Sequence, residues 1–239
     1  MVPFGMICRR RATGACHGDN DKKKMSRLVL LILSLSLFFF TFFPASATTV
    51  TIGEFFSETE VTAPIMINGV QDLAAATTKI SYDPTVLSVT AIKKGELGSF
   101  TSNLYYAQDG WVKMTGYLVG GGRSGNVKFA ELTISPRGSY GAYSTLQIEV
   151  ETLSDTEYRT IDADVIDGFY YIGINGDVQP DRVIDAADSE YIARGIAGVP
   201  GYPPKFGPSE VSGDGIVDAY DCVYLARHAA GVTGYEALH

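Results

Sequence analysis

The sequence predicts a mainly β protein in which an antiparallel β-sandwich precedes a small α-helical module. Residues 48–173 hold many short runs of alternating apolar and polar residues, separated by turn residues and without a long helical pattern. Residues 174–239 hold two acidic stretches that repeat each other at an offset of 33 residues, each followed by apolar residues at helical spacing. We expect residues 1–47 to be an N-terminal extension and signal peptide.

The first 47 residues follow the order of a secretory signal peptide. Basic residues within 22–27 precede an uncharged apolar run over 28–43, and the small residues 45–47 come next. We expect cleavage after Ala47, and therefore a secreted protein that is extracellular or at the cell surface. An uncleaved membrane anchor is the alternative, although the run is shorter than the roughly 20 residues that span a bilayer. A true start at Met25 is a further alternative.

Removal of residues 1–47 would make the chain strongly acidic. It would take away seven of the 19 Lys and Arg residues and two of the 27 Asp and Glu residues, leaving 12 basic and 25 acidic residues and a formal charge near −13. Such a surface makes nucleic acid a poor partner, because phosphate backbones bind positive charge. Cys222 would be the only cysteine left, which excludes a disulfide framework.

The predicted strands follow one another from residue 49 to residue 173. Asp83-Pro84 predicts a turn, and Asp109-Gly110 predicts a hairpin between strands 103–107 and 111–118. Many short strands with turns at regular intervals favour an antiparallel sandwich. The other runs with a strand pattern are 49–53, 76–82, 86–92, 127–134, 145–152 and 165–172.

The two acidic stretches have the ligand spacing of calcium loops. Oxygen-bearing side chains fall at loop positions 1, 3, 5, 9 and 12, and an apolar residue at position 7 would offer its backbone carbonyl. We therefore predict two Ca²⁺ sites, with ligands at Asp177, Gln179, Asp181, Val183, Asp185 and Asp188 in the first loop, and at Glu210, Ser212, Asp214, Ile216, Asp218 and Asp221 in the second. The first loop is the poorer match, because Pro180 stands at position 4 and Arg182 at position 6, where a sharp turn favours glycine.

Each loop runs into one short predicted helix. Residues 191–194 are matched by residues 224–227, and a glycine follows each helix as a stop. No helix is expected to enter the second loop, since three prolines precede it. This doubled loop-helix unit resembles a type I-like dockerin domain over residues 174–239, a calcium module that binds cohesin domains. A solvated acidic linker is the alternative interpretation.

A second resemblance concerns the strands. Residues 80–92, the basic-acidic turn at 93–96, residues 129–134 and the late Asp167-Gly168 resemble a cohesin domain over about residues 49–173. The resemblance implies a jelly-roll β-sandwich, similar to carbohydrate-binding modules, that receives dockerins. A generic immunoglobulin-like sandwich is the alternative.

The two resemblances together imply a secreted, non-catalytic assembly protein. It would link cohesin-bearing and dockerin-bearing extracellular proteins through a calcium-dependent interaction, for instance in polysaccharide degradation. A chain that carries both halves could also link head to tail with its own copies. The dockerin resemblance implies partner contacts at Ala186, Ala187, Arg194, Ala219, Tyr220 and Arg227.

No catalytic residues are predicted. After residue 47 only His228 and His239 remain, so a histidine triad or a zinc centre is not expected. Glu58 and Glu60 share one face of a possible strand, and solvated surface acids are a simpler interpretation than a glycosidase pair. The alternative function is a carbohydrate-binding module tethered by its dockerin. It would use aromatic residues that otherwise alternate into the core, namely Tyr105, Tyr106, Trp111, Tyr117, Phe169, Tyr170 and Tyr171.

Overall fold

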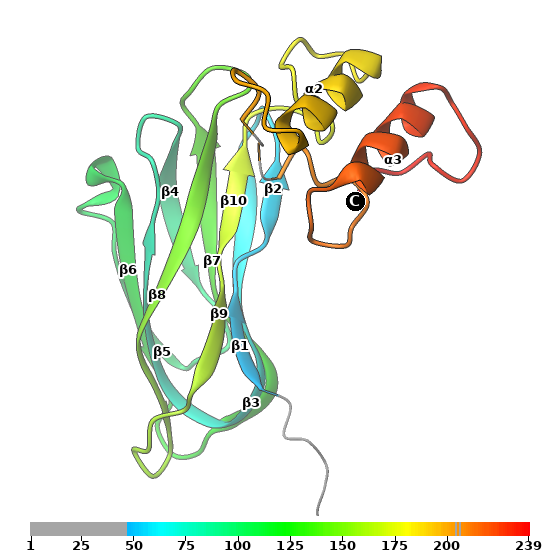
Figure 1. The fold of residues 1–239 in the computed structure, drawn as a ribbon. Helices are drawn as coiled ribbons and strands as arrows, with labels where there is room; N and C mark the ends of the chain where they lie inside the picture. The colour runs from blue at the N-terminus through cyan, green and yellow to red at the C-terminus, as the bar shows by residue number, and fades with distance from the viewer. Residues whose placement is uncertain (1–46, 204, 206) are drawn as a thin grey trace, which may run out of the picture. The chain divides into compact units, whose positions relative to one another are not determined.

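The computed structural model describes residues 47–239 except residues 204 and 206 (Figure 1). The predictions of an N-terminal extension, a signal peptide and a start at Met25 concern residues that lie outside this described part. The described residues belong to one compact unit. None of its helices combines the length and the apolar composition of a membrane-spanning segment.

The described part contains ten strands, one short 3-10 helix and two α-helices. The prediction of a mainly β fold followed by two helices is confirmed. In chain order the elements are β1 (Thr48–Thr51), β2 (Glu54–Phe56), β3 (Val61–Ser81), β4 (Leu87–Lys94), β5 (Ser99–Asn103), η1 (Ala107–Asp109), β6 (Trp111–Tyr117), β7 (Arg123–Pro136), β8 (Tyr143–Asp155), β9 (Ala163–Ile166), β10 (Gly168–Tyr171), α2 (Ala186–Ile196) and α3 (Ala219–Ala229).

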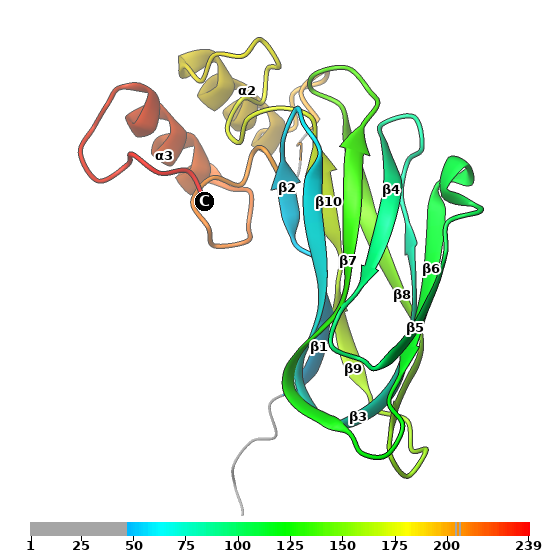
Figure 2. The same ribbon diagram turned by 180° about the vertical axis from the view of Figure 1, so that it is seen from behind.

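Strand β3 belongs to both layers of the sandwich. Its first half pairs with β1 and β7, and its second half pairs with β6 and β8. The strand bends between the halves, where Gly69 and Asp72 have positive φ angles of 66° and 55° and the pairing shifts register. Bulges of this kind let a strand turn a corner between packed sheets. One layer therefore runs β4–β7–β3–β1–β9 and the other β5–β6–β3–β8–β10–β2, as Figures 1 and 2 show from opposite sides.

Two strand pairs are parallel, which corrects the prediction of a wholly antiparallel sandwich. β1 pairs with β9 and β2 pairs with β10 in parallel. The chain changes layer between β1 and β2 at Gly53, and between β9 and β10 at Asp167, whose side chain accepts a hydrogen bond from the N–H of Ile148 at 2.8 Å. The run over 165–172 is therefore two strands. An alternating pattern does not reveal such a break, because the partner of a strand depends on distant segments.

The connection between β5 and β6 also differs from the predicted hairpin. The two strands do pair antiparallel, but the first one ends at Asn103 and the short helix η1 follows before β6 begins. Ala107 of η1 is buried, and its carbonyl accepts a hydrogen bond from the Tyr82 hydroxyl at 2.8 Å. The predicted strand 103–107 is therefore wrong. The contacts of Ala107 with the core place this residue in η1 instead of in an extended strand. Asp109-Gly110 instead closes the turn, with the glycine at a φ of 83°.

Buried apolar side chains form two clusters. The larger fills the sandwich, and its members Phe129, Leu132 and Ile65 have no exposed surface. The smaller cluster lies in the loop-helix region and consists of Val178, Ile192, Val211, Tyr224 and Leu225. Because few side chains form it, this second cluster buries less apolar surface than the core of the sandwich. The domain boundaries after residues 47 and 173 remain predictions.

Candidate functional site

The two acidic loops end in the same backbone geometry. Asp185 precedes α2 with φ −141° and ψ −168°, and Asp218 precedes α3 with φ −142° and ψ −168°. Each aspartate accepts a hydrogen bond from a backbone N–H two residues on, at 2.7 Å from Ala187 and at 2.6 Å from Tyr220. Such caps satisfy N–H groups that the start of a helix leaves without a partner. The repeat in the sequence is therefore also a repeat in the structure.

The carboxylate at position 12 of the first loop, Asp188, joins the beginning of the loop to its end. It is buried and accepts hydrogen bonds from the N–H groups of Gln179 at 2.8 Å and Asp185 at 3.0 Å. Burial raises the pKa of Asp188, these N–H donors lower it, and the charge of Asp177 raises it again. Asp177, at position 1, is itself fully buried. Two carboxylates therefore share a confined space.

Asp221 has the same role in the second loop. It is fully buried and accepts hydrogen bonds from the N–H groups of Val211 at 3.0 Å, Ser212 at 3.1 Å and Asp218 at 2.9 Å. Glu210, at position 1, accepts three more from donors within the loop, at 2.7 to 3.1 Å. Hydrogen bonds thus hold the second loop closed from its first residue to its last.

The turn at position 6 is the same in both loops although the residues differ. Arg182 has a φ of 74° and Gly215 has a φ of 79°. A residue with a Cβ rarely adopts this left-handed conformation, so the backbone is strained at Arg182 and relaxed at Gly215. The sharp turn that a calcium loop requires nevertheless forms in both loops.

The two loops fit Ca²⁺ in the chemistry of their donors. Carboxylate, amide and hydroxyl oxygens at alternate positions are the groups that this hard cation binds. In residues 47–239 other than 204 and 206, however, no three His, Cys, Asp or Glu side chains form a group that could hold a metal ion. The carboxylates accept hydrogen bonds from their own loops instead, as Asp181 does from the N–H of Val183 at 2.8 Å. The two Ca²⁺ sites therefore remain a prediction.

The outer face of the layer β5–β6–β3–β8 carries a row of polar and aromatic side chains. Thr77 and Lys79 of β3 and Trp111 and Lys113 of β6 alternate with buried neighbours and so point outward. Lys79 pairs with Glu149 of β8 at 3.2 Å and lies 5.6 Å from the centroid of the Trp111 ring. Sequence reasoning missed this surface. The alternation could have identified the outward residues, but not the fact that these strands are neighbours.

A family model of the cohesin domain matches residues 49–168. The chain belongs to the cohesin family. Cohesin domains are non-catalytic modules of protein–protein interaction. The cohesin resemblance of the strands is therefore confirmed, and the alternative of a generic immunoglobulin-like sandwich is set aside. The match does not reach residues 174–239, so the dockerin resemblance of that region remains a prediction.

Several solved cohesin structures are similar to this chain. The seventh ScaB type I cohesin from Pseudobacteroides cellulosolvens is 18% identical, with a TM-score of 0.48 over 53% of this chain and 92% of that chain. A non-cellulosomal cohesin from the archaeon Archaeoglobus fulgidus is 16% identical, with a TM-score of 0.47 over 56% of this chain and 96% of that chain. The Coh-OlpA–Doc918 complex from Clostridium thermocellum is 16% identical, with a TM-score of 0.47 and coverages of 53% and 99%. No curated protein matches the chain.

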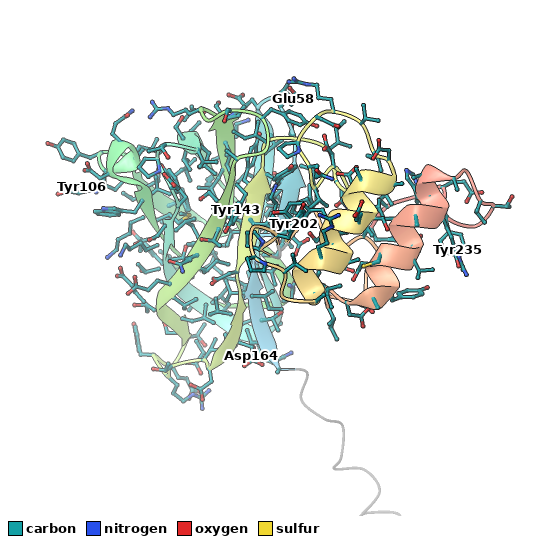
Figure 3. The ribbon with its side chains drawn as sticks, turned by 45° about the horizontal axis from the view of Figure 1, so that its top comes forward. Glu58, Tyr106, Tyr143, Asp164, Tyr202 and Tyr235 are labelled. Atoms are coloured by element: carbon teal, nitrogen blue, oxygen red, sulfur yellow. The ribbon has the colours of Figure 1, made fainter. Side chains whose placement is uncertain are left out.

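The six predicted partner contacts are all exposed on the two helices: Ala186, Ala187, Arg194, Ala219, Tyr220 and Arg227. Both arginines stack on tyrosines of the same chain. The Arg194 guanidinium lies 4.8 Å from the centroid of the Tyr202 ring, and the Arg227 guanidinium lies 5.0 Å from that of the Tyr235 ring. Figure 3 labels the two tyrosines. The Arg–Tyr pair is thus a further feature that the two repeats share. Contact with a partner at these six residues remains a prediction.

The two acids considered for glycosidase chemistry lie in the loop between β2 and β3, which corrects their placement on a strand. Glu58 pairs with Arg182 at 2.5 Å, and Glu60 accepts a hydrogen bond from the Ser135 hydroxyl at 2.7 Å. Each carboxylate therefore has its own partner, which favours the interpretation as structural surface acids.

The aromatic residues considered for sugar binding divide between the core and the surface of the cohesin domain. Tyr170 and Tyr171 have no exposed surface, whereas Tyr105 is 82% exposed and Tyr117 is 50% exposed. Core packing therefore accounts for the first two residues, and only the exposed ones are available to stack on a sugar ring.

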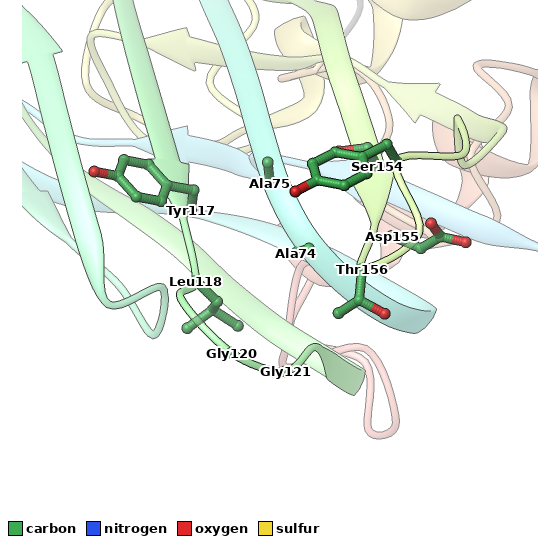
Figure 4. A pocket seen from close by; sticks show the side chains of 10 residues that line it. Ala74, Ala75, Tyr117, Leu118, Gly120, Gly121, Ser154, Asp155 and Thr156 are labelled. Atoms are coloured by element: carbon green, nitrogen blue, oxygen red, sulfur yellow. The ribbon is translucent and has the colours of Figure 1, made fainter.

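A hollow of about 420 Å³ opens next to Tyr117 in the cohesin domain (Figure 4). The small residues Ala74 and Ala75 of β3 line it between Tyr117 and Thr156. Tyr158 also lines the hollow, is 93% exposed and has a φ of 63°. Sequence reasoning missed Tyr158, because nothing in its neighbourhood marks an exposed aromatic residue in a turn.

Proposed function

We propose that this chain is a secreted, non-catalytic assembly protein that carries both a cohesin domain and a dockerin-like module. Its cohesin domain would bind dockerin-bearing proteins. Residues 174–239 would act as a calcium-dependent, dockerin-like module for cohesin-bearing proteins, including further copies of this chain. The proposal rests on the presence, in one chain, of a cohesin domain and a doubled loop-helix unit with repeated cap geometry. A place in extracellular polysaccharide degradation belongs to the same proposal.

The outer face of β5–β6–β3–β8 is the surface that we assign to dockerin binding. Trp111 stands on it, stacked on Tyr106 with ring centroids 4.2 Å apart. Aromatic side chains surrounded by polar residues are typical anchors of protein interfaces. Lys79 and Lys113 pair with carboxylates of β8. The face can therefore lose water to a partner without leaving these lysines unpaired.

Replacing Trp111 with alanine is expected to weaken dockerin binding by about 2 kcal/mol, roughly thirtyfold, because the interface loses its aromatic anchor. Titration of the immobilised chain (residues 48–239) with purified type I dockerins measures the change. Ile166→Ala is the control, since this exposed side chain belongs to β9 in the other layer of the sandwich. Equal losses in the two variants, or no loss in the Trp111 variant, would speak against the assigned surface.

In the acidic loops, Ca²⁺ would supply the positive charge that crowded carboxylates lack and would connect the two ends of each loop. The residues that would hold it are the twelve predicted ligands. The chain itself orients these oxygens, because buried Asp188 and Asp221 already tie each loop to the start of its helix. Because the apolar cluster of this region is small, a bound cation would add stability that the cluster does not supply.

Removing calcium is expected to destabilise the helical module and to leave the sandwich folded. At a free calcium concentration about 100 times the Kd, one site adds about 2.7 kcal/mol of stability. Circular dichroism and size-exclusion chromatography of residues 48–239, with calcium and then with chelator, report on helix content and head-to-tail association. We expect less helix and only monomer in chelator. Unchanged helix content, together with no heat of calcium binding at millimolar concentration, would refute the calcium sites.

Carbohydrate binding by the cohesin domain is the second candidate, and the hollow beside Tyr117 and Tyr158 favours it. Exposed aromatic rings stack on sugar rings, and polar residues such as Thr156 line the same hollow. The variants Tyr158→Ala and Trp111→Ala, tested on insoluble polysaccharides, separate the two candidates. Retention lost by Tyr158→Ala and kept by Trp111→Ala would support sugar binding here, whereas no retention of the unaltered chain would exclude it.

A further inference from the structure

The first acidic loop lies against the cohesin domain, where two tyrosines hold its first residue. Tyr140, in the connection between β7 and β8, donates a hydrogen bond from its hydroxyl to Oδ2 of Asp177 at 2.5 Å. Tyr171, at the end of β10 and without exposed surface, donates one to the backbone carbonyl of Asp177 at 2.7 Å. Hydrogen bonds to a charged acceptor are stronger than those between neutral groups. Asp177 is therefore fixed from the side of the sandwich.

Both departures of the first loop from the calcium-loop pattern face the cohesin domain. Arg182, at position 6, pairs with Glu58 at 2.5 Å, and its guanidinium lies 4.2 Å from the centroid of the Tyr140 ring. Pro180, at position 4, packs on Gly141, where an added Cβ would come within 2.5 Å of the proline ring. The residues that make the first loop a poorer calcium loop are thus the residues that attach it to the sandwich.

Cationic side chains also lie beside the first loop. Lys205 donates a hydrogen bond to the carbonyl of Val178 at 2.5 Å. The backbone N–H of Arg182 donates a hydrogen bond to Oδ2 of Asp177 at 2.8 Å. In the described part of the chain, the carboxylates of neither acidic loop form a salt bridge with Lys or Arg. Two cationic residues of the protein therefore lie next to the first loop without forming salt bridges to its carboxylates.

We infer that Glu58, Tyr140, Tyr171 and Arg182 form a latch that keeps the first loop ordered on the cohesin domain of its own chain when calcium is absent. Within residues 47–239 other than 204 and 206, no side-chain hydrogen bond or ion pair joins the second loop to the sandwich, so the cation would contribute more to the order of this loop. This inference deepens the proposed function and rests on it only for the calcium response of the second loop. Calcium would then control the second loop and α3, while the first loop stays attached.

Hydrogen exchange of the chain (residues 48–239) in chelator tests the latch at matched amides. Asp181 and Asp214 both occupy position 5, and their N–H groups bond to the position-1 carboxylate of their own loops at 3.3 Å and 3.1 Å. We expect the Asp181 amide to exchange at least about tenfold more slowly than the Asp214 amide, since a hydrogen bond to a charged group contributes that much. Equal exchange at the two amides in chelator would overturn the inference.

Arg182→Gly removes the latch side chain and keeps the turn, because Gly215 adopts the same conformation in the second loop. We expect this variant to speed exchange at Asp181 about tenfold in chelator. Arg194→Ala is the control, since Arg194 pairs with Glu190 inside α2 instead of with the sandwich. Exchange at Asp181 that is the same in the Arg182 and Arg194 variants would contradict the latch.

Tyr140→Phe is a second latch variant, because it removes only the hydroxyl that bonds to Asp177. It is expected to speed exchange at Asp181 as well, with the core amide of Phe129 serving as a check that the sandwich is folded. An unchanged Asp181 amide in this variant would count against the latch. Failure of the proposed calcium response is a separate result, because calcium would then alter neither loop while the effects of both variants in chelator persisted.

Discussion

Gly168→Ala is expected to destabilise the cohesin domain by about 3 kcal/mol, the upper range for an added methyl group in a packed site. Gly168 is buried at the point where the chain passes from β9 to β10. A Cβ there would lie 2.0 Å from the carbonyl oxygen of Gly53 and 2.6 Å from a methyl carbon of Ile52. This oxygen belongs to the backbone of the connection between β1 and β2. It therefore cannot move away as the end of a flexible side chain would. The parallel pairing of β2 with β10 must open instead.

Urea unfolding of the chain measures this loss, because the midpoint falls with stability. Gly98→Ala is the matched control. Its Cβ would meet the Leu118 side chain at 3.6 Å, which is ordinary van der Waals contact. If the midpoints of the two variants shifted by the same small amount, the close approach at Gly168 would not be a determinant of the fold.

Asp221→Ala is expected to unfold the second loop and α3, with a loss of about 3 kcal/mol or more. The substitution leaves the N–H groups of Val211, Ser212 and Asp218 without their acceptor, and each unsatisfied donor costs about 1–3 kcal/mol when buried. The small apolar cluster of this region cannot offset such a loss. The effect should add to that of calcium removal, so that α3 exchanges faster in chelator than α3 of the unaltered chain, because these hydrogen bonds do not involve a cation.

Amide exchange of α3 and helix content by circular dichroism report the result. Asp214→Ala is the control within the same loop, since its exposed carboxylate accepts a hydrogen bond from the N–H of Ile216 at 2.9 Å. It should cost about 1 kcal/mol or less in chelator, as a single exposed hydrogen bond does. An Asp221 variant whose α3 exchanges in chelator as slowly as α3 of the unaltered chain would show that the buried carboxylate does not hold the loop.

The loop-helix repeat could be predicted because its determinants are local. Asp185 and Asp188 cap α2 within one turn, and Asp218 and Asp221 do so for α3. Hydrogen bonds that close over so few residues depend on the order of residue types, which the sequence displays directly. The same holds for the outward and inward alternation along β6 and β8.

The predictions that failed concern segments whose conformation depends on distant partners. Asp167 interrupts what looked like one strand, because the chain changes layer there beside Gly53. The strand expected at 103–107 gives way to η1, because Ala107 packs into the core and bonds to Tyr82. Neither partner lies close in sequence, so no local pattern marks the change.

The residue order alone was enough to establish the acidic repeats, the two helices and the strand-rich segment that proved to be a cohesin domain. Folding then decided which segments meet. Arg182 reaches Glu58 across 124 residues of chain, and Thr77, Lys79 and Trp111 form one face only because β3 and β6 pair. Short-range hydrogen bonds and periodicity act within a few residues, whereas strand partners and layer crossings follow from the packing of the whole sandwich.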